Sequence, residues 1–250
     1  NALVAGGGTG DAAIMLAQHL ADRGEAGQVT YLDLSTASRK IAEGRAKTRG
    51  LKNITFLTGS LLDLPKMDLP LFDYIDCCGV LHHLEEPEAG LAALAECLAD
   101  NGGVGLMLYA TLGRTGVYPM QNALKALAAG DTVSEQIKSA KILLKDLPPS
   151  NWLNKNVAVG DHKLGEDAAL YDLLLHPRDR SYLVPEVLDL LATAGLELVS
   201  FIEPARYDPE LYLKDRDLRK KARKLDTGKQ AALAENLAGN IKTHSFYVRN

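Results

Sequence analysis

The residues that can bind a ligand cluster near the beginning of the chain. The apolar segment Ala2-Leu3-Val4-Ala5 has the character of a buried strand and runs into glycines at positions 6, 7, 8 and 10. Such a turn, followed directly by a helix, lets the backbone approach a ligand and points free N–H groups at it. Asp33 ends the next apolar segment, near the offset of roughly 20 residues at which an acid binds ribose hydroxyls. The pattern predicts a nucleoside-binding site, although Asp33 as a helix N-cap or surface acid is the alternative.

The spacing of the glycines narrows the choice of ligand. They follow the pattern G-x-G-x-G, and Asp11 stands where the dinucleotide fingerprint G-x-G-x-x-G requires glycine. The Gly-Lys-Ser/Thr ending of a phosphate-binding loop does not follow either. An acid at position 11 is unfavourable beside a pyrophosphate, but it is compatible with a ligand that carries an ammonium and a sulfonium.

Strands and helices alternate around these residues. We expect strands at 2–5, 28–33, 54–57, 72–77, 104–110, 196–202 and 244–249. Between the early strands, apolar residues at helical spacing predict helices, one of them carrying Leu91, Leu94, Ala95 and Leu98 on its buried stripe and ending before Gly102-Gly103. This order predicts an α/β fold with a mostly parallel, Rossmann-like sheet, in which a ligand binds beyond the carboxyl ends of the strands.

Four segments in this order resemble the motifs of class I S-adenosylmethionine-dependent methyltransferases. They are Gly6-Gly7-Gly8-Thr9-Gly10-Asp11, Tyr31-Leu32-Asp33-Leu34-Ser35, Gly59-Ser60-Leu61-Leu62-Asp63-Leu64-Pro65, and Phe72-Asp73-Tyr74-Ile75 continuing through Gly79-Val80-Leu81-His82-His83-Leu84. The resemblance covers roughly residues 2–110 and the last two strands. It implies a seven-stranded sheet whose last strand is antiparallel, and S-adenosylmethionine as the cofactor.

The resemblance also implies a role for each matching position. The turn formed by Ala5, Gly6, Gly7, Gly8 and Gly10 is expected to hold the methionyl part of the cofactor, and Asp33 with Leu34 the ribose. Around the adenine and the sulfonium we expect Ser60, Leu61, Asp63, Cys78, Gly79, Val80 and His83.

Two positions depart from the family pattern. Val4 stands where an acid is frequent, and Ser60 stands where an acid usually follows the glycine of the third motif. These two departures leave open an alternative: the protein is a binding module that retains the cofactor site but does not catalyse methyl transfer. A nicotinamide-dependent oxidoreductase would need a second nucleotide-binding half, which residues 112–250 do not supply.

The alternation stops between residues 112 and 182, which predicts three parts: a cofactor-binding core at 1–111, a helical insertion or lid at 112–182, and completion of the core at 183–250. We expect helices near 117–127, 133–145 and 166–175 in the lid. Tyr109, Arg178 and Arg180 are the candidates for acceptor binding. Tyr109, His162 and His176 are the candidates for a general base. A local ion-pair network of Arg178-Asp179-Arg180 is the alternative role for the two arginines.

Composition excludes several function classes. Apolar residues make up 46% of the chain and charged residues 24%, as in globular proteins, and no apolar run reaches the length of a membrane span. The net charge of −4 argues against a nucleic-acid partner, and the basic run at 214–224 is interpreted as a solvated helix face.

The three cysteines, Cys77, Cys78 and Cys97, lack metal-ligand spacing and fit reduced thiols in a cytoplasmic protein, so we expect no metal. The expected reaction is methyl transfer to a small-molecule acceptor, with a protein or RNA acceptor left open.

Overall fold

The computed structural model describes residues 1–24, 26–163 and 165–250, and the chain divides into two compact units. Unit 1 contains residues 1–108, 185–204 and 244–250, and unit 2 contains residues 109–184 and 205–243. Each unit has a hydrophobic cluster of its own.

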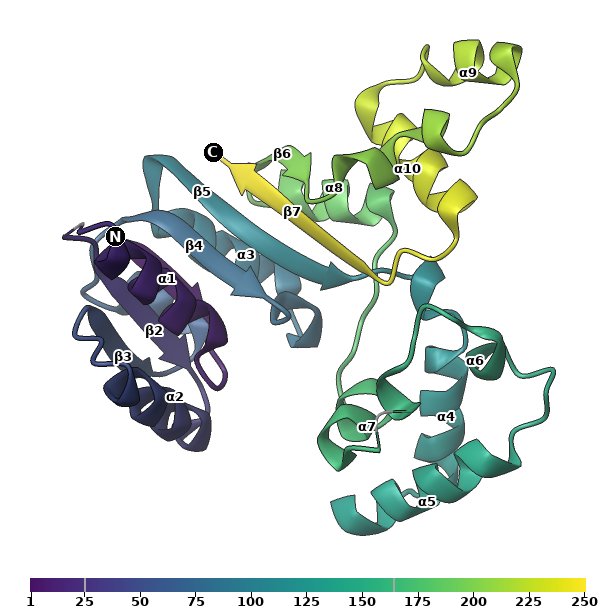
Figure 1. Ribbon diagram of the computed structural model, residues 1–250, viewed down its shortest axis with the longest axis horizontal. Helices are drawn as coiled ribbons and strands as arrows, with labels where there is room; N and C mark the ends of the chain where they lie inside the picture. Colours follow the sequence, from purple (N-terminus) through teal and green to yellow (C-terminus); the bar gives the residue numbers. More distant parts are fainter. Residues whose placement is uncertain (25, 164) are drawn as a thin grey trace. The chain divides into compact units, whose positions relative to one another are not determined.

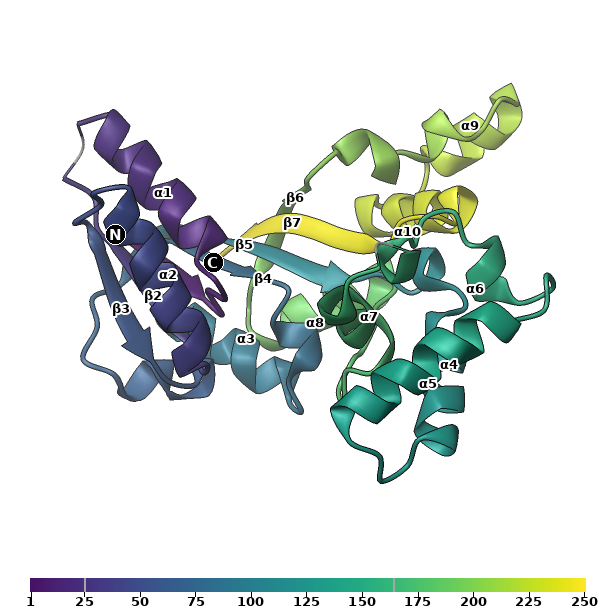
Figure 2. The same ribbon diagram turned by 60° about the horizontal axis from the view of Figure 1, so that its bottom comes forward.

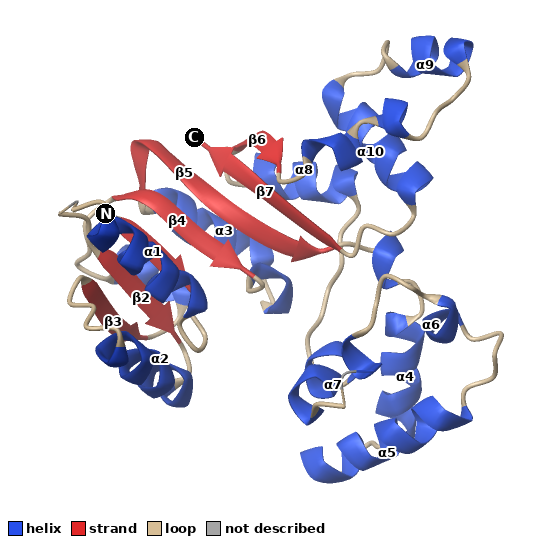
Figure 3. Ribbon diagram, in the orientation of Figure 1, coloured by secondary structure: helices blue, strands red, loops and turns tan. Residues whose placement is uncertain are grey.

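Unit 1 is built on a seven-stranded sheet with the order β3-β2-β1-β4-β5-β7-β6 (Figures 1 and 3). The β1–β2, β2–β3, β1–β4 and β4–β5 pairs are parallel, whereas β6 and β7 are antiparallel. This confirms the predicted fold, including its antiparallel last strand. The strands are β1 (Ala2–Ala5), β2 (Val29–Asp33), β3 (Ile54–Thr58), β4 (Phe72–Cys78), β5 (Leu98–Tyr109), β6 (Glu197–Phe201) and β7 (Thr243–Arg249).

Four helices cover the two faces of this sheet. Helices α1 (Asp11–Asp22) and α2 (Thr36–Thr48) lie on one face, and α3 (Pro87–Glu96) and α8 (Val184–Thr193) lie on the other (Figures 1 and 2). The chain moves outward from β1 to β3 in one direction and from β4 to β5 in the other. Because crossovers between parallel strands are right-handed, helices on the two sides of this reversal lie on opposite faces. The reversal lies between β1 and β4, and a ligand crevice is expected there.

Strand β1, which lies between β2 and β4 inside the sheet, is apolar along its whole length. All four of its residues are buried, as is typical of a parallel strand inside a sheet. Small side chains of α1, Ala13 and Ala17, pack on this sheet with no exposed surface. The close fit brings the beginning of α1 directly to the end of β1.

The boundary between α3 and β5 differs from the prediction. Leu98 was expected on the buried stripe of the helix, but it is the first residue of β5, and the strand continues through Gly102 and Gly103. The β4–β5 register shifts at this point, from Phe72 opposite Leu98 to Tyr74 opposite Gly103. A Cβ on Gly102 would lie 2.9 Å from the carbonyl oxygen of Phe72. The glycines therefore accommodate an irregularity inside a strand and do not separate two elements.

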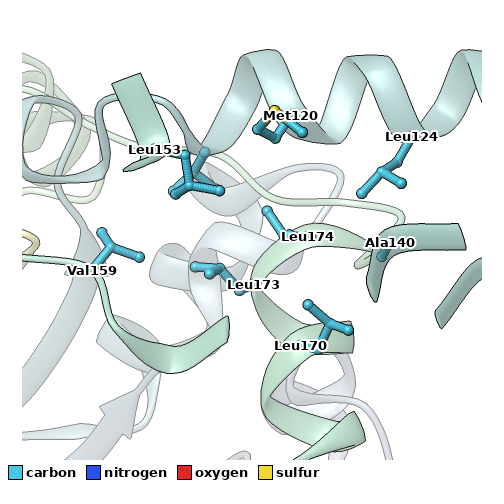
Figure 4. Close-up of a cluster of buried hydrophobic side chains, with 9 residues drawn as sticks. Met120, Leu124, Ala140, Leu153, Val159, Leu170, Leu173 and Leu174 are labelled. Atoms are coloured by element: carbon cyan, nitrogen blue, oxygen red, sulfur yellow. The ribbon is translucent and has the colours of Figure 1, made fainter. Parts of the chain in front are cut away.

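Unit 2 is mainly helical in its described residues. Nine apolar residues form its buried cluster, and Figure 4 labels eight of them: Met120, Leu124, Ala140, Leu153, Val159, Leu170, Leu173 and Leu174. The ninth is Val117. The α-helices are α4 (Val117–Leu127), α5 (Val133–Asp146), α6 (Trp152–Lys155), α7 (Asp167–Leu174), α9 (Arg216–Ala222) and α10 (Thr227–Ala238).

The three helices expected in the insertion match α4, α5 and α7 within two residues at each end. Thr132 begins α5 with a capping box: its side chain accepts from the Glu135 N–H, and the Glu135 side chain accepts from the Thr132 N–H. Short 3-10 turns complete the description, at Leu61–Lys66 (η1), Leu81–His83 (η2), Leu112–Arg114 (η3), Asp161–Lys163 (η4), Pro204–Tyr207 (η5) and Pro209–Leu211 (η6). Within the described residues, no helix has the length and apolar character needed to cross a lipid bilayer.

Candidate functional site

The glycine turn at the end of β1 is held against β2 by its backbone. The N–H groups of Gly6 and Gly7 both donate to the carbonyl oxygen of Leu32, at 2.8 and 3.0 Å. The Tyr31 hydroxyl donates to the carbonyl oxygen of Gly8 at 2.6 Å. Burial and the nearby Asp33 charge raise the pKa of Tyr31 to about 12, so this donor stays protonated. Sequence reasoning did not assign Tyr31 a role, although it lies two residues before Asp33.

Two glycines of the turn need their lack of a side chain for different reasons. A Cβ on Gly6 would lie 2.3 Å from Cγ2 of Val80, so the turn and the loop after β4 touch only because this residue is glycine. Gly8 has a φ of +51° and open space within 4 Å of the place where a Cβ would be. The turn therefore closes on one side and leaves room on the other. Gly10, the N-cap of α1, provides no side-chain cap for the first turn of that helix.

Asp33 ends β2 and lies next to the glycine turn. One carboxylate oxygen accepts from the N–H of Gly8 at 2.7 Å, and the other accepts from the N–H of Ser35 at 2.7 Å. Ser35 is itself the N-cap of α2, so the two N–H groups fix the Asp33 side chain without using it as the cap. A carboxylate offers about four acceptor positions, and two remain for a diol.

These residues line a cavity of about 130 Å³, which we call the Asp33 cavity. Its lining includes six of the predicted cofactor residues: Gly6, Asp33, Leu34, Ser60, Leu61 and Val80. Leu32, Gly59 and Leu84 complete it and were not predicted. Leu84 could have been predicted from the sequence. It is the apolar residue that follows a short turn beginning at Val80, so its side chain can pack back against that turn. Leu34 is 71% exposed, which leaves a large apolar side chain at the rim.

Ser60 and Asp63 belong to the turn η1. The Ser60 hydroxyl accepts from the N–H of Leu62 at 3.2 Å and so caps this turn, while Leu61 is buried. Asp63 is paired with Lys66 at 3.4 Å and is not part of the cavity lining. Of the two, Ser60 is therefore the one whose position suits a ligand in the Asp33 cavity.

The end of β4 carries Cys78 and Gly79. The Cys78 thiol lies 3.7 Å from a carboxylate oxygen of Asp76, and burial, with that charge second, raises the pKa of the thiol to about 12. Gly79 has a φ of +78°, and its N–H donates to Met107 in the neighbouring β5. A protonated thiol is a weak nucleophile, so Cys78 is not suited to covalent catalysis.

The His82-His83 pair lies in η2. His82 is buried and His83 is half-buried, with ring centroids 4.3 Å apart in an edge-on arrangement. In the part of the chain that the structure describes, no group of three or more His, Cys, Asp and Glu side chains is arranged to hold a metal ion. The three cysteines are free thiols.

The Asp11 carboxylate forms an ion pair that the sequence did not indicate. Arg45 of α2 donates to its carboxylate at 2.5 Å and also to the carbonyl oxygen of Thr9 at 2.8 Å. The hydrogen bond from Arg45 lowers the pKa of Asp11. Arg45 thus links α2 to the beginning of α1 and keeps an ionised acid beside the turn.

The side chain of Tyr109, the last residue of β5, contacts Asp172 and Arg114 of unit 2. Its hydroxyl donates to Asp172 of α7 at 3.1 Å, and the guanidinium carbon of Arg114 lies 3.7 Å from the centroid of its ring. Burial, with the Asp172 charge second, raises the pKa of Tyr109. At neutral pH Tyr109 is therefore a hydrogen-bond donor and a poor general base.

Arg114 also forms a buried ion pair with Asp179. Their distance is 2.9 Å, the exposed fractions of the two side chains are 7% and 0%, and Gln121 donates to the same carboxylate oxygen at 2.8 Å. The sequence favoured pairing of Asp179 with its neighbours Arg178 and Arg180. The structure gives it a partner 65 positions earlier in the chain, which no local pattern could indicate.

The other acceptor and base candidates lie at the surface of unit 2 or near it. His162 belongs to η4, and burial lowers its pKa, which favours the neutral ring. His176 contacts the backbone of Arg178, whose N–H lies 3.3 Å from Nδ1 of the ring. The guanidinium carbon of Arg180 lies 4.8 Å from the ring centroid of Tyr182.

Comparisons with known proteins agree with this arrangement. Residues 3–104 match the family model described as a methyltransferase domain. An uncharacterized protein of Synechococcus is 29% identical over an alignment of 255 positions, which covers 98% of this chain and 59% of the relative.

Two solved structures share the fold. PKMT2 from Rickettsia typhi in complex with AdoHcy is similar with a TM-score of 0.77 at 16% identity, over 100% of this chain and 48% of that one. Magnesium protoporphyrin IX methyltransferase from Synechocystis with bound SAH has a TM-score of 0.51 at 16% identity, over 100% of this chain and 74% of that one. The chain thus spans about half of the Rickettsia protein and 59% of the Synechococcus one.

Proposed function

Residues 3–104 match a methyltransferase domain model, and from this premise we propose that the chain is a class I S-adenosylmethionine-dependent methyltransferase that transfers the methyl group to a small-molecule acceptor. The observation that carries the proposal is the Asp33 cavity. It combines a glycine turn, a carboxylate with free acceptor positions and four leucines at the carboxyl ends of β1, β2, β3 and β4.

Each part of the cavity suits one part of this cofactor. The free acceptor positions of Asp33 suit the two ribose hydroxyls. Leu34, Leu61 and Leu84 offer apolar surface to the adenine, and Ser60 a polar edge. Gly6 and Gly8 leave space for the methionyl chain, near the uncapped first turn of α1. The other predicted cofactor residues lie in or beside the same turns: Ala5, Gly7, Gly10, Cys78, Gly79 and His83. Asp63 does not line the cavity, and we retain it only as a neighbour of Ser60.

The cofactor supplies a methyl group on a sulfonium, from which a neutral thioether departs without an acid. The protein therefore has to hold the acceptor in line with the methyl group, and orientation of this kind is worth up to ~7–11 kcal/mol. The Tyr109 hydroxyl, which burial and the Asp172 charge keep protonated, gives its one hydrogen to Asp172 and can accept a hydrogen bond from the acceptor. If the acceptor arrives protonated, the candidate base is His162, whose neutral form is favoured by burial, or His176.

The proposal of a small-molecule acceptor is supported by the sequence after β4, by a structural relative and by the net charge. Cys77-Cys78-Gly79 stands where enzymes that methylate the exocyclic amines of bases carry an Asn/Asp/Ser-Pro-Pro-aromatic motif. The Synechocystis relative is by its name a methyltransferase of a small molecule. The negative net charge gives no general attraction to nucleic acid.

Calorimetric titration with S-adenosylmethionine and with its demethylated product tests the cofactor assignment. We expect the wild type to bind both compounds. The Asp33→Ala variant should bind them at least about tenfold more weakly, because the two ribose hydroxyls lose the carboxylate oxygens that accept their hydrogen bonds. The matched control is Asp22→Asn, which changes an exposed carboxylate at the other end of α1. Equal affinities for the wild type and Asp33→Ala contradict the role of Asp33.

A second measurement separates catalysis from binding alone. The protein is incubated with S-adenosylmethionine labelled in its methyl group and with a whole-cell extract that contains metabolites, protein and RNA. Label in a dialysable product supports the small-molecule acceptor, whereas label that stays with protein or RNA favours the macromolecular alternative. Cofactor binding without methyl transfer to any fraction favours the non-catalytic module.

A further inference from the structure

A second cavity, of about 280 Å³, lies within unit 2, and nothing in the proposed reaction uses it. Three chain segments line it: η3 with the residue after it, α6 with the residues after it, and the two residues that follow α10. We call it the Trp152 cavity, and its lining residues are Leu112, Thr115, Trp152, Lys155, Asn156, Val157, Gly239 and Asn240. The motifs of the methyltransferase domain lie outside these segments.

Backbone contacts fix the walls of the Trp152 cavity. The N–H of Gly113 donates to the carbonyl oxygen of Ile241 at 2.9 Å, and a Cβ on Gly113 would lie 2.2 Å from the backbone of Ile241. The side-chain amide of Asn156 donates to the carbonyl oxygens of Gly113 and Thr115, both at 2.9 Å. Leu153, next to Trp152, is fully buried in the cluster of unit 2. The cavity is thus preorganised by three segments that are far apart in the sequence.

The rim of the cavity exposes apolar surface. Trp152, the sole tryptophan of the chain, is 64% exposed, and Val157 is 95% exposed. Indole is the side chain that contributes most often to binding energy, because it offers a large flat surface at low entropic cost. An exposed tryptophan beside a hollow with fixed walls is therefore suited to stacking on a flat ligand.

The charge of the lining selects among flat ligands. The ammonium nitrogen of Lys155 lies 5.5 Å from the centroid of the Trp152 ring. No carboxylate belongs to the lining, and among residues 1–24, 26–163 and 165–250 no ion pair is found for Lys155. The Lys155 ammonium lies over the indole ring, so a ligand that stacks on Trp152 meets a positive charge that no carboxylate of the lining neutralises.

We propose that the Trp152 cavity binds a small planar aromatic carboxylate, whose ring stacks on Trp152 and whose carboxylate pairs with Lys155. The site is separate from the Asp33 cavity, whose lining residues all belong to unit 1. It therefore adds a second ligand site to the protein, independent of whether the cofactor assignment holds.

A matched pair of ligands tests the charge preference. 4-Nitrobenzoate and 4-nitrobenzamide share the ring and differ in charge, and nitroaromatics quench indole fluorescence. Since Trp152 is the sole tryptophan, its emission reports on this cavity directly. We expect saturable quenching by the acid and an affinity for the amide that is weaker by about fivefold or more. Quenching that rises linearly without saturation, or equal affinities for acid and amide, overturns the proposal.

Variants assign the interaction to its residues. Lys155→Met is expected to remove the difference between acid and amide, and Trp152→Leu to abolish binding of both in calorimetry. The matched control is Lys125→Met, because Lys125 lines another cavity of about 280 Å³ in unit 2 that contains no tryptophan. If Lys125→Met weakens acid binding as much as Lys155→Met does, the assignment to the Trp152 cavity is wrong. Binding of the demethylated cofactor, measured on the same variants, reports separately on the Asp33 cavity.

Discussion

Asp33 and Gly8 are coupled through one hydrogen bond of 2.7 Å, so the shape of the turn and the direction of the carboxylate depend on each other. The sequence indicated both residues from their types and spacing, but not this contact. It also did not indicate Tyr31, which holds the carbonyl oxygen of Gly8, or Arg45, which pairs with Asp11. These partners come from neighbouring elements, and a pattern along one chain does not contain such contacts.

The Gly6→Ala variant tests how closely the turn approaches the loop after β4. The positive φ costs about 1–2 kcal/mol, and the overlap with Val80 adds about 1–3 kcal/mol. We expect a correspondingly lower free energy of unfolding in urea and weaker cofactor binding. Gly50→Ala is the matched control, since Gly50 has a φ of +69° but open space around it. Adding Val80→Ala should recover part of the loss, and a double variant no better than Gly6→Ala contradicts the overlap.

The raised pKa of Cys78 predicts slow alkylation at neutral pH. A thiol with a pKa of about 12 has far less thiolate at pH 7 than an ordinary thiol with a pKa near 8.5, and only the thiolate reacts. The rate should therefore keep rising as the pH increases from 9 to 11. Mass spectrometry of Cys78-containing peptides after iodoacetamide treatment measures it. A rate that levels off near pH 9 would mean that the thiol is not perturbed.

At the scale of elements, the pattern of apolar residues predicted nearly all strands and most helices, because both faces of the parallel sheet are covered and each helix has one buried stripe. The exception at Leu98 has a physical cause. Gly102 and Gly103 were interpreted as the end of a helix, whereas they permit a register shift within β5. Glycine marks a backbone irregularity in both cases, and the sequence alone does not distinguish them.

The Arg114–Asp179 pair joins the segment after β5 to the segment after α7 inside unit 2. Since both side chains are buried, removing one partner leaves an uncompensated charge, which costs about 3–5 kcal/mol. We expect Asp179→Leu to lower the unfolding free energy by about this amount. The double variant Arg114→Met/Asp179→Leu should recover most of it, because an apolar pair carries no buried charge. Thermal unfolding of the three proteins at one pH decides the matter, and additive losses in the double variant would contradict the coupling.

At the scale of the whole molecule, the Asp33 cavity is lined only by residues of unit 1, and the Arg114–Asp179 pair belongs to unit 2. We therefore expect Asp179→Leu to bind the demethylated cofactor with an affinity within about threefold of the wild type, at a temperature where both are folded. Calorimetry on the two proteins makes the comparison. A tenfold difference would show that the cofactor site depends on unit 2.

The division of the chain into two units also explains why the sequence predicts a cofactor site in more detail than an acceptor site. Residues 3–104 contain the motifs that identify the cofactor, because its binding requires particular residue types at the strand ends. Acceptor binding requires a shape built from distant segments, and the contact of Tyr109 with Asp172, 63 positions later, is an example that no local pattern contains. The sequence accordingly predicts a cofactor site residue by residue, of which six residues line the Asp33 cavity, and an acceptor site only as a segment.

The most direct test is a crystal structure of the protein with S-adenosylhomocysteine. We predict that the ribose hydroxyls lie within hydrogen-bond distance of the Asp33 carboxylate, with the adenine against Leu34, Leu61 and Leu84. A nucleoside bound elsewhere, or an Asp33 carboxylate that contacts only Gly8 and Ser35 while the ligand is present, would contradict the account.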